Sequence, residues 1–370
     1  MSAMRTLLLA ATAAFALALP ALAQDEPKGA PAPSEIVAAA PEADWVAIAA
    51  EDLLVMTLAP DADGTPRQVV IQLMPAPFSQ GWVHNIRLFA RAKWYDGISV
   101  NRVQDNYVTQ WGDPNYDNPE ATGQAKPLPE GLKVMGEADY VATDLLSIPD
   151  PRGRPRFNYT LGAMITRNAM IAANGAVIVP DGLKQALESG TPPEKIETPE
   201  MGDTYAPFAT LALGWPIAGS MGKEGNGFWP THCYGMVGVG RNYSPDTGSG
   251  AELYTVIGHA PRHLDRNIAL VGRVIEGMQH LSSLPRGSGD LGFYTAEESA
   301  KRIPILSVRL ASDLPADEQP AFEYLSTESG TFATYAEAIA NRRDPFFIVP
   351  AGGADICNIR VPVRRVAGGG

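Results

Sequence analysis

The first third of the chain has the alternating pattern of a β-rich protein. Residues 53–58 form a short apolar run, residues 61–66 carry turn formers, and residues 68–73 alternate between apolar and polar side chains. This order predicts a β-hairpin. A helix is expected from Ser79, at its N-cap, to about residue 92, because its apolar residues recur at helical spacing.

The rest of the chain mixes strand patterns with a long irregular stretch. Residues 114–230 are rich in proline and glycine, with a strand-like part at 175–179 and a helix-like part at 181–189. A structureless loop of this length is uncommon in a compact domain, so order is expected around 159–171 and 208–217. Strand patterns return later, and a closing strand is predicted at 305–311. Beyond it the pattern predicts a helix at 332–343 and strands at 346–349 and 359–366.

The N-terminus has the features of an export signal. Arg5 supplies a positive charge, an apolar stretch follows, and Ala21-Leu22-Ala23 forms a small-residue cleavage site. Residues 1–23 are therefore predicted to be removed, which places the protein in the periplasm or outside the cell. No later apolar run is long enough to span a bilayer, so no membrane insertion is expected after cleavage. Residues 24–50, rich in Ala, Pro and Glu, predict a flexible leader that docks through Trp45.

Charge and cysteine content narrow the range of partners. Removing the signal takes one arginine from 29 basic residues, so the mature charge is 28 minus 41, or −13. Such an acidic chain is not expected to bind nucleic acid. An oxidising compartment would permit Cys233 and Cys357 to form a disulfide, although two separate buried thiols remain an alternative.

Two blocks of residues resemble the cyclophilins, the peptidyl-prolyl cis-trans isomerases. The first block carries Tyr95, Gly97, Arg102, Tyr107, Gln110, Gly112 and Asp113 in the family's register. The second includes the stretch GMVGVGRN from Gly235 and then Leu264, Asp265, Gly272, Val274, Gly277 and Met278. Two separated blocks in the right order are more specific than one short motif.

The resemblance implies a mainly β fold, a closed eight-stranded antiparallel barrel with two capping helices. The predicted organisation is a cyclophilin-like domain at 51–312 with an insertion at about 114–230. A C-terminal α/β extension at 313–370 would pack on the barrel.

The resemblance also implies a site. Arg102 would donate a hydrogen bond to the twisted prolyl amide, and Gln110 would help hold the arginine and the substrate. Other matching positions would bind substrate around the proline pocket: Tyr107, Val108, Glu252, Tyr254, His263 and Leu264. Glu252 and His263 stand where the family usually has Gln and Trp. The implied substrates are Xaa-Pro segments of exported proteins during folding, with no cofactor; a binding module without useful turnover is the alternative.

Other motifs indicate different chemistry but are weaker. His259 and His263 have the spacing of metal ligands, yet Pro261 between them argues for a loop, so no metal is expected. His232 and Cys233 could suggest a base beside a thiol nucleophile, but residues that are neighbours in the sequence seldom form such a catalytic pair. The stretch around Ser249 lacks the spacing of a hydrolase nucleophile elbow.

Overall fold

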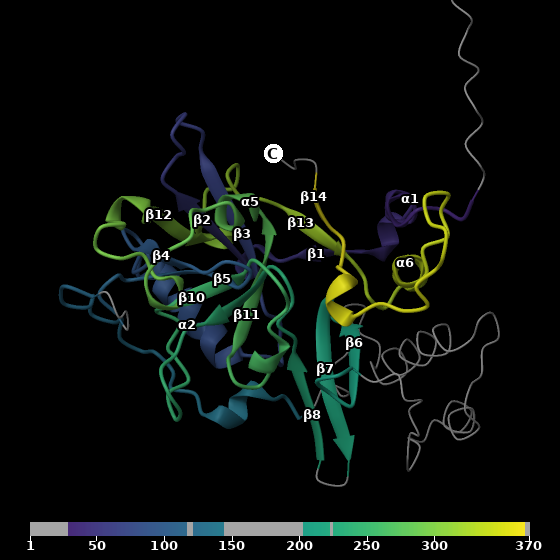
Figure 1. The fold of residues 1–370 in the computed structure, drawn as a ribbon, viewed down its shortest axis with the longest axis horizontal. Helices are drawn as coiled ribbons and strands as arrows, with labels where there is room; N and C mark the ends of the chain where they lie inside the picture. Colours follow the sequence, from purple (N-terminus) through teal and green to yellow (C-terminus); the bar gives the residue numbers. More distant parts are fainter. Residues whose placement is uncertain (1–28, 117–120, 144–202, 223–224, 367–370) are drawn as a thin grey trace, which may run out of the picture.

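A computed structural model describes residues 29–116, 121–143, 203–222 and 225–366. Its centre is a closed barrel of antiparallel strands in the order β10-β5-β4-β12-β2-β3-β11-β9 (Figure 1). The strands are β2 (Leu53–Leu58), β3 (Arg67–Leu73), β4 (Ser99–Val103), β5 (Val108–Gly112), β9 (Met236–Val239), β10 (Leu253–Val256), β11 (Leu270–Glu276) and β12 (Ile303–Leu310). The predicted eight-stranded barrel is therefore confirmed.

The opening hairpin forms as the apolar pattern predicts. Strand β2 pairs with β3 from Leu53 opposite Gln72 to Leu58 opposite Arg67. The Asp61 carboxylate accepts hydrogen bonds from the backbone N–H groups of Asp63 and Thr65, at 3.0 and 2.8 Å. These local bonds fix the turn, and the turn fixes the register that sends alternate side chains into the barrel.

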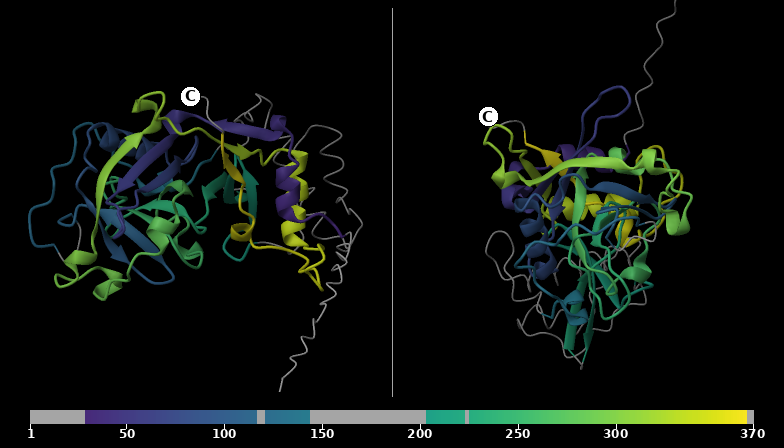
Figure 2. Two further views of the ribbon diagram at one scale, coloured as in Figure 1. Left: turned by 90° about the horizontal axis from the view of Figure 1, so that it is seen from above. Right: turned by 90° about the vertical axis from the view of Figure 1, so that its left-hand side faces the viewer.

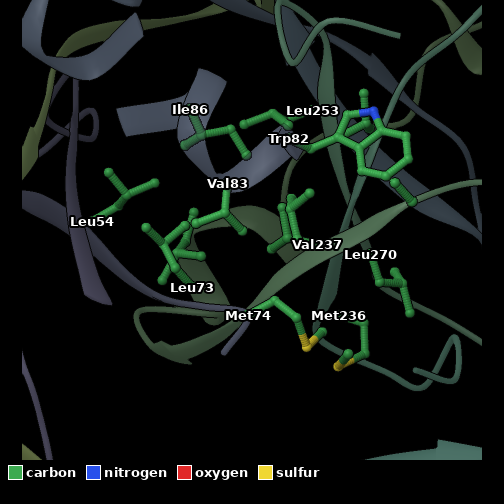
Figure 3. Packing of buried hydrophobic residues seen from close by; sticks show 14 of the residues in the cluster. Leu54, Leu73, Met74, Trp82, Val83, Ile86, Met236, Val237, Leu253 and Leu270 are labelled. Atoms are coloured by element: carbon green, nitrogen blue, oxygen red, sulfur yellow. The ribbon is translucent and has the colours of Figure 1, made fainter. Parts of the chain in front are cut away.

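Helix α2 (Gln80–Arg91) closes one end of the barrel. Its apolar face carries Trp82, Val83 and Ile86, which point towards Leu54 and Leu253 of the strands (Figure 3). Ser79 occupies the N-cap as predicted but makes no side-chain capping bond, because its backbone is left-handed at φ 54°. The second expected capping helix is a single turn, α5 (Gln279–Ser282), with Leu281 fully buried.

Part of the predicted insertion is a separate antiparallel sheet. This insertion sheet consists of β6 (Phe208–Ala212), β7 (Trp215–Gly222) and β8 (Gly225–Pro230). It lies between the barrel and the C-terminal region in Figures 1 and 2. The order expected at 208–217 is confirmed, whereas the elements expected at 159–171, 175–179 and 181–189 lie outside the described residues.

Residues from both ends of the chain form a satellite, defined here as residues 33–48 and 322–365. Its sheet has the order β1-β13-β14, from β1 (Trp45–Ile48), β13 (Phe322–Leu325) and β14 (Val363–Arg365). Helix α1 (Pro33–Ala38) packs on α6 (Gly330–Ala340) beside this sheet (Figure 2). Figures 1 and 2 show the satellite to one side of the barrel.

The satellite corrects four expectations. Residues 33–48 are helix and strand rather than a flexible leader, because β1 pairs with β13 and Trp45 is buried beside Phe332. The strand expected at 346–349 is instead an exposed turn that pairs with no strand in the part of the chain that the structure describes. The expected last strand shortens to β14, and the expected helix begins earlier, at Gly330, where Ser329 accepts a hydrogen bond from the backbone of Phe332.

A disulfide joins the satellite to the barrel. Cys233 lies just before β9, Cys357 lies in the short helix η8 (Ile356–Asn358), and their sulfur atoms are 2.02 Å apart. The alternative of two separate thiols is therefore wrong. Among the helices that the structure describes, none is both long and apolar enough to cross a bilayer.

Candidate active site

The candidate site lies on the outer face of three adjacent barrel strands. Arg102 of β4 is opposite Gln110 of β5, and Gln110 is opposite Tyr254 of β10. Residues opposite one another in neighbouring strands share a face of the sheet. Register thus brings the distant Tyr254 beside Arg102 and Gln110, which lie only 8 residues apart.

A β-bulge turns Arg102 towards this face. Val100 is opposite Trp111, whereas Arg102 is opposite Gln110, so Asn101 is an extra residue in β4. Val100 and Trp111 are buried in the barrel core. Without the extra residue, strict alternation would place Arg102 on the same face as Val100. The bulge therefore decides that the guanidinium lies outside the core.

Neutral acceptors hold the Arg102 guanidinium. Its Nε donates to the carbonyl oxygen of Leu291 at 2.7 Å, its Nη1 donates to Oε1 of Gln110 at 3.0 Å, and its Nη2 donates to Gln104. An arginine has five N–H donors, so two remain for a ligand. No carboxylate among the described residues forms an ion pair with Arg102.

Aromatic rings flank the same guanidinium. The rings of Tyr107 and Phe293 lie 5.6 and 5.4 Å from its central carbon. Burial lowers the pKa of Arg102 below its usual value, and Tyr107 and Tyr254 oppose this shift. An arginine has so high a pKa that the guanidinium stays charged at neutral pH. It is a fixed, charged donor in a partly dry setting.

Glu252 sets the orientation of the Gln110 amide. Its Oε2 accepts a hydrogen bond from Nε2 of Gln110 at 3.1 Å, and both residues are buried. A carboxylate only accepts and a guanidinium only donates, so Gln110 must point its NH2 at Glu252 and its oxygen at Arg102. A Cβ at Gly112 would collide with the Glu252 carboxylate, so glycine there makes room for it. The glutamate therefore supports the arginine through Gln110.

The groove in front of Arg102 has a volume of about 430 Å³. Its apolar lining includes Val108, Tyr254, Tyr107 and Ile268, which pack together over the buried Val256. Leu264 also lines it, in the short helix η4 (Arg262–Leu264). The structure thus brings together Arg102, Gln110, Tyr107, Val108, Glu252, Tyr254 and Leu264. It leaves out His263, which is exposed on η4 and does not line the groove.

Several groove residues are absent from the sequence interpretation. Leu291 and Phe293 come from the loop before β12, where Phe293 forms an isolated bridge with Arg102. Gln104 and residues 240–243 complete the rim. The loop that carries Leu291 and Phe293 has no sequence motif, so its contact with Arg102 is visible only from its pairing with β4 in the structure.

The other candidate chemistries do not assemble. Cys233 is in the disulfide, so it offers no thiol beside His232. Within the described parts of the chain, no cluster of three or more His, Cys, Asp or Glu side chains has the arrangement of a metal site.

The closed barrel with an arginine at the edge of an apolar outer groove places the chain in the class of cyclophilin-like folds. The family model described as cyclophilin type peptidyl-prolyl cis-trans isomerase/CLD matches residues 68–310, and the chain belongs to this family. No curated protein matches it.

One similar solved structure is that of cyclophilin AquaCyp293 from Hirschia baltica. It has 17% sequence identity and a TM-score of 0.54, and the match covers 87% of this chain and 93% of that chain. At this identity the likeness supports the fold and says nothing about individual site residues.

Proposed function

We propose that the chain catalyses cis–trans isomerisation of Xaa-Pro peptide bonds. Rotation about a peptide bond has a barrier of about 18–20 kcal/mol because twisting removes amide resonance. The twisted prolyl nitrogen regains a lone pair that the planar ground state lacks. A donor that meets only this nitrogen lowers the barrier by binding the transition state better than either isomer.

The observation that carries the proposal is the state of Arg102. It is charged, held in one place by three neutral acceptors, and without a carboxylate partner among the described residues. Its remaining donors are available beside an apolar groove of a size that suits a proline ring and its neighbours. No step in this chemistry requires a cofactor.

The proposed substrates are proline-containing segments of exported proteins during folding. Uncatalysed Xaa-Pro isomerisation takes tens to hundreds of seconds, which is slow enough to limit folding. The predicted export signal and the disulfide both fit an oxidising compartment such as the periplasm.

A second candidate is a binding module for proline-containing segments with little turnover. It is favoured by the unusual groove, in which Glu252 is buried and three donors of Arg102 are already engaged. Binding without rate enhancement would support this reading.

The test is an isomerisation assay on a short Xaa-Pro peptide, using the chain without its predicted signal. Arg102→Ala is expected to cut the catalysed rate at least about tenfold, the scale of losing one transition-state donor. Arg91→Ala is the matched control, since it removes an exposed arginine of α2 that pairs with Glu51 and Asp313. An unchanged rate in Arg102→Ala would rule out the proposed role.

A further inference from the structure

A chain of buried polar side chains lies beneath the groove. The Tyr254 hydroxyl is 2.9 Å from Nε2 of His232, and Nδ1 of His232 is 2.9 Å from Oδ1 of Asp265. The other oxygen of Asp265 accepts from Nε of Arg262 at 2.6 Å, and Nη1 of Arg262 donates to Asp203 at 2.6 Å. His232 is fully buried, and the other four are nearly so.

The chemistry of the partners gives these bonds a direction. The Asp265 carboxylate accepts a hydrogen bond from the backbone N–H of His232, and it is placed to accept a second one from the ring N–H at Nδ1. Burial lowers the pKa of His232, opposed by Asp265, and burial raises the pKa of Tyr254 well above its usual value. A neutral imidazole with its proton on Nδ1 has a lone pair on Nε2, so the Tyr254 hydroxyl donates to it.

The backbone makes room for this contact. Gly238 of β9 lies directly opposite Tyr254 of β10. A Cβ at Gly238 would collide with the Tyr254 hydroxyl. The Tyr254 ring therefore crosses β9 over Gly238, which has no side chain to block it. On the other side of the strand, the Tyr254 hydroxyl contacts His232. Its ring remains in the lining of the groove.

We propose that His232 is a positioning residue that fixes Tyr254 as the wall of the proline pocket. The hydroxyl bond prevents the ring from tilting and keeps the polar end of Tyr254 out of the groove, so the substrate meets an apolar face. Asp265 and Arg262 act one step further away by holding the imidazole. This inference rests on the proposed function, because it assigns the groove to a prolyl segment.

The test is a double-mutant cycle read by peptide affinity. Tyr254→Phe and His232→Leu are each expected to weaken the Kd for an Xaa-Pro peptide about fivefold, the scale of one lost neutral hydrogen bond. In His232→Leu the turnover of bound peptide should change less than about twofold, because this variant alters neither Arg102 nor a residue that lines the groove. The double variant should resemble either single variant, since both remove the same bond.

Conservative replacement separates positioning from a merely structural role. His232→Gln keeps a polar side chain under Tyr254 and is expected to restore most of the affinity lost in His232→Leu. It also serves as the second variant if His232→Leu does not fold. If His232→Leu lowers thermal stability but leaves the Kd unchanged, or if the two losses multiply in the double variant, the proposal is wrong.

A spectroscopic readout does not depend on catalysis. The ¹⁵N shifts of the His232 ring in the wild-type chain should report a protonated Nδ1 and a hydrogen-bonded, unprotonated Nε2, and the Nε2 signal should move in Tyr254→Phe. A proton on Nε2 would overturn the proposed direction. A chain that shows the expected spectrum but neither binds nor isomerises peptide would contradict the proposed function and, with it, the role assigned to Tyr254, while leaving the buried bond itself established.

Discussion

The barrel and the satellite are held together by different means. The barrel strands form a closed ring around one large apolar core, to which α2 contributes Trp82, Val83 and Ile86. The satellite sheet has three short strands and open edges, and its smaller core is drawn from both chain ends, with Leu211 added from the insertion sheet. Closure removes sheet edges, so the barrel is complete in itself, whereas the satellite depends on contacts made far along the chain.

This difference implies that the satellite contributes to the stability of the protein, whereas the groove and its chemistry belong to the barrel. The groove residues that the structure describes all belong to the barrel or to loops that leave it. The satellite touches the barrel through a second apolar cluster that includes Ile48, Phe322 and Val55, and through the disulfide. Loss of the satellite should therefore cost stability before it costs activity.

Removal of the disulfide is expected to have the largest effect on the stability of the satellite relative to the barrel. Cys233 and Cys357 are 124 residues apart, and a link over so long a loop contributes about 4 to 5 kcal/mol in the chain-entropy estimate. The Cys233→Ser/Cys357→Ser variant should lose a comparable free energy of unfolding in denaturant titrations. Its affinity for an Xaa-Pro peptide should stay near the wild-type value. No loss of stability would show that other contacts already fix the satellite.

A matched pair of core truncations sharpens the comparison. Phe89 of α2 and Phe332 of α6 are both buried, at 0% and 4% exposure, one in each region. Truncation of a buried phenylalanine to alanine costs about 3–5 kcal/mol. Phe89→Ala should lower both barrel stability and peptide binding, whereas Phe332→Ala should lower stability alone. Equal losses of binding in the two variants would contradict the division proposed here.

Glu252 tests the support behind Arg102 at a smaller scale. Glu252→Ala leaves the buried Nε2 of Gln110 without its acceptor, a cost of roughly 1–3 kcal/mol. The Gln110 amide is then free to rotate away from Arg102, so kcat/KM should fall by about fivefold to a hundredfold, since each 1.4 kcal/mol is about a factor of ten. Glu252→Gln retains an acceptor and should show a smaller loss. A faster enzyme in either variant would mean that the carboxylate hinders Arg102.

The smallest expected effect is a pH dependence in the loop that contacts Arg102. Glu298 pairs with Lys301 and accepts hydrogen bonds from the backbone of Ser288 and Thr295, and these partners lower its pKa to about 2. A depressed folded pKa means that the support is complete above the usual value of 4.5 and is lost as pH falls towards 2. The protection factor of the Phe293 amide, in which the intrinsic pH dependence of exchange is divided out, should fall over that interval, and Glu298→Gln should remove this pH dependence. A flat profile in the wild-type chain would show that the loop is fixed by other contacts.

The closed barrel was implied by the resemblance to cyclophilins, whereas the hydrophobic pattern alone predicted its opening hairpin, because the strands of a hairpin lie close together in the chain. The strand at residues 53–58 was predicted correctly because its partner β3 follows directly after one short turn. Strand β1 was missed because its partner β13 is more than 270 residues away. The apolar run at 346–349 shows the opposite error: β-propensity without a neighbouring strand gives no strand.

For the candidate site, too, the sequence proposed individual residues but not the contacts between distant segments that hold them. The resemblance proposed Arg102, Gln110 and Tyr254, which the structure brings together, but it could not show the bulge at Asn101 that turns the arginine outwards. It also placed His263 beside Leu264 at the pocket, where the structure shows Leu264 and Ile268 but not His263. The support from Leu291, Phe293 and His232 depends on contacts between distant segments, and composition carries no signal for these.

The central claim is that Arg102 acts on the twisted amide and contributes little to holding the planar peptide. The most direct measurement is NMR exchange between the cis and trans forms of an Xaa-Pro peptide at saturating protein, compared between wild type and Arg102→Ala. We predict that the Kd changes by less than about threefold while the catalysed exchange rate falls at least about tenfold. Equal exchange rates at equal occupancy would contradict the account.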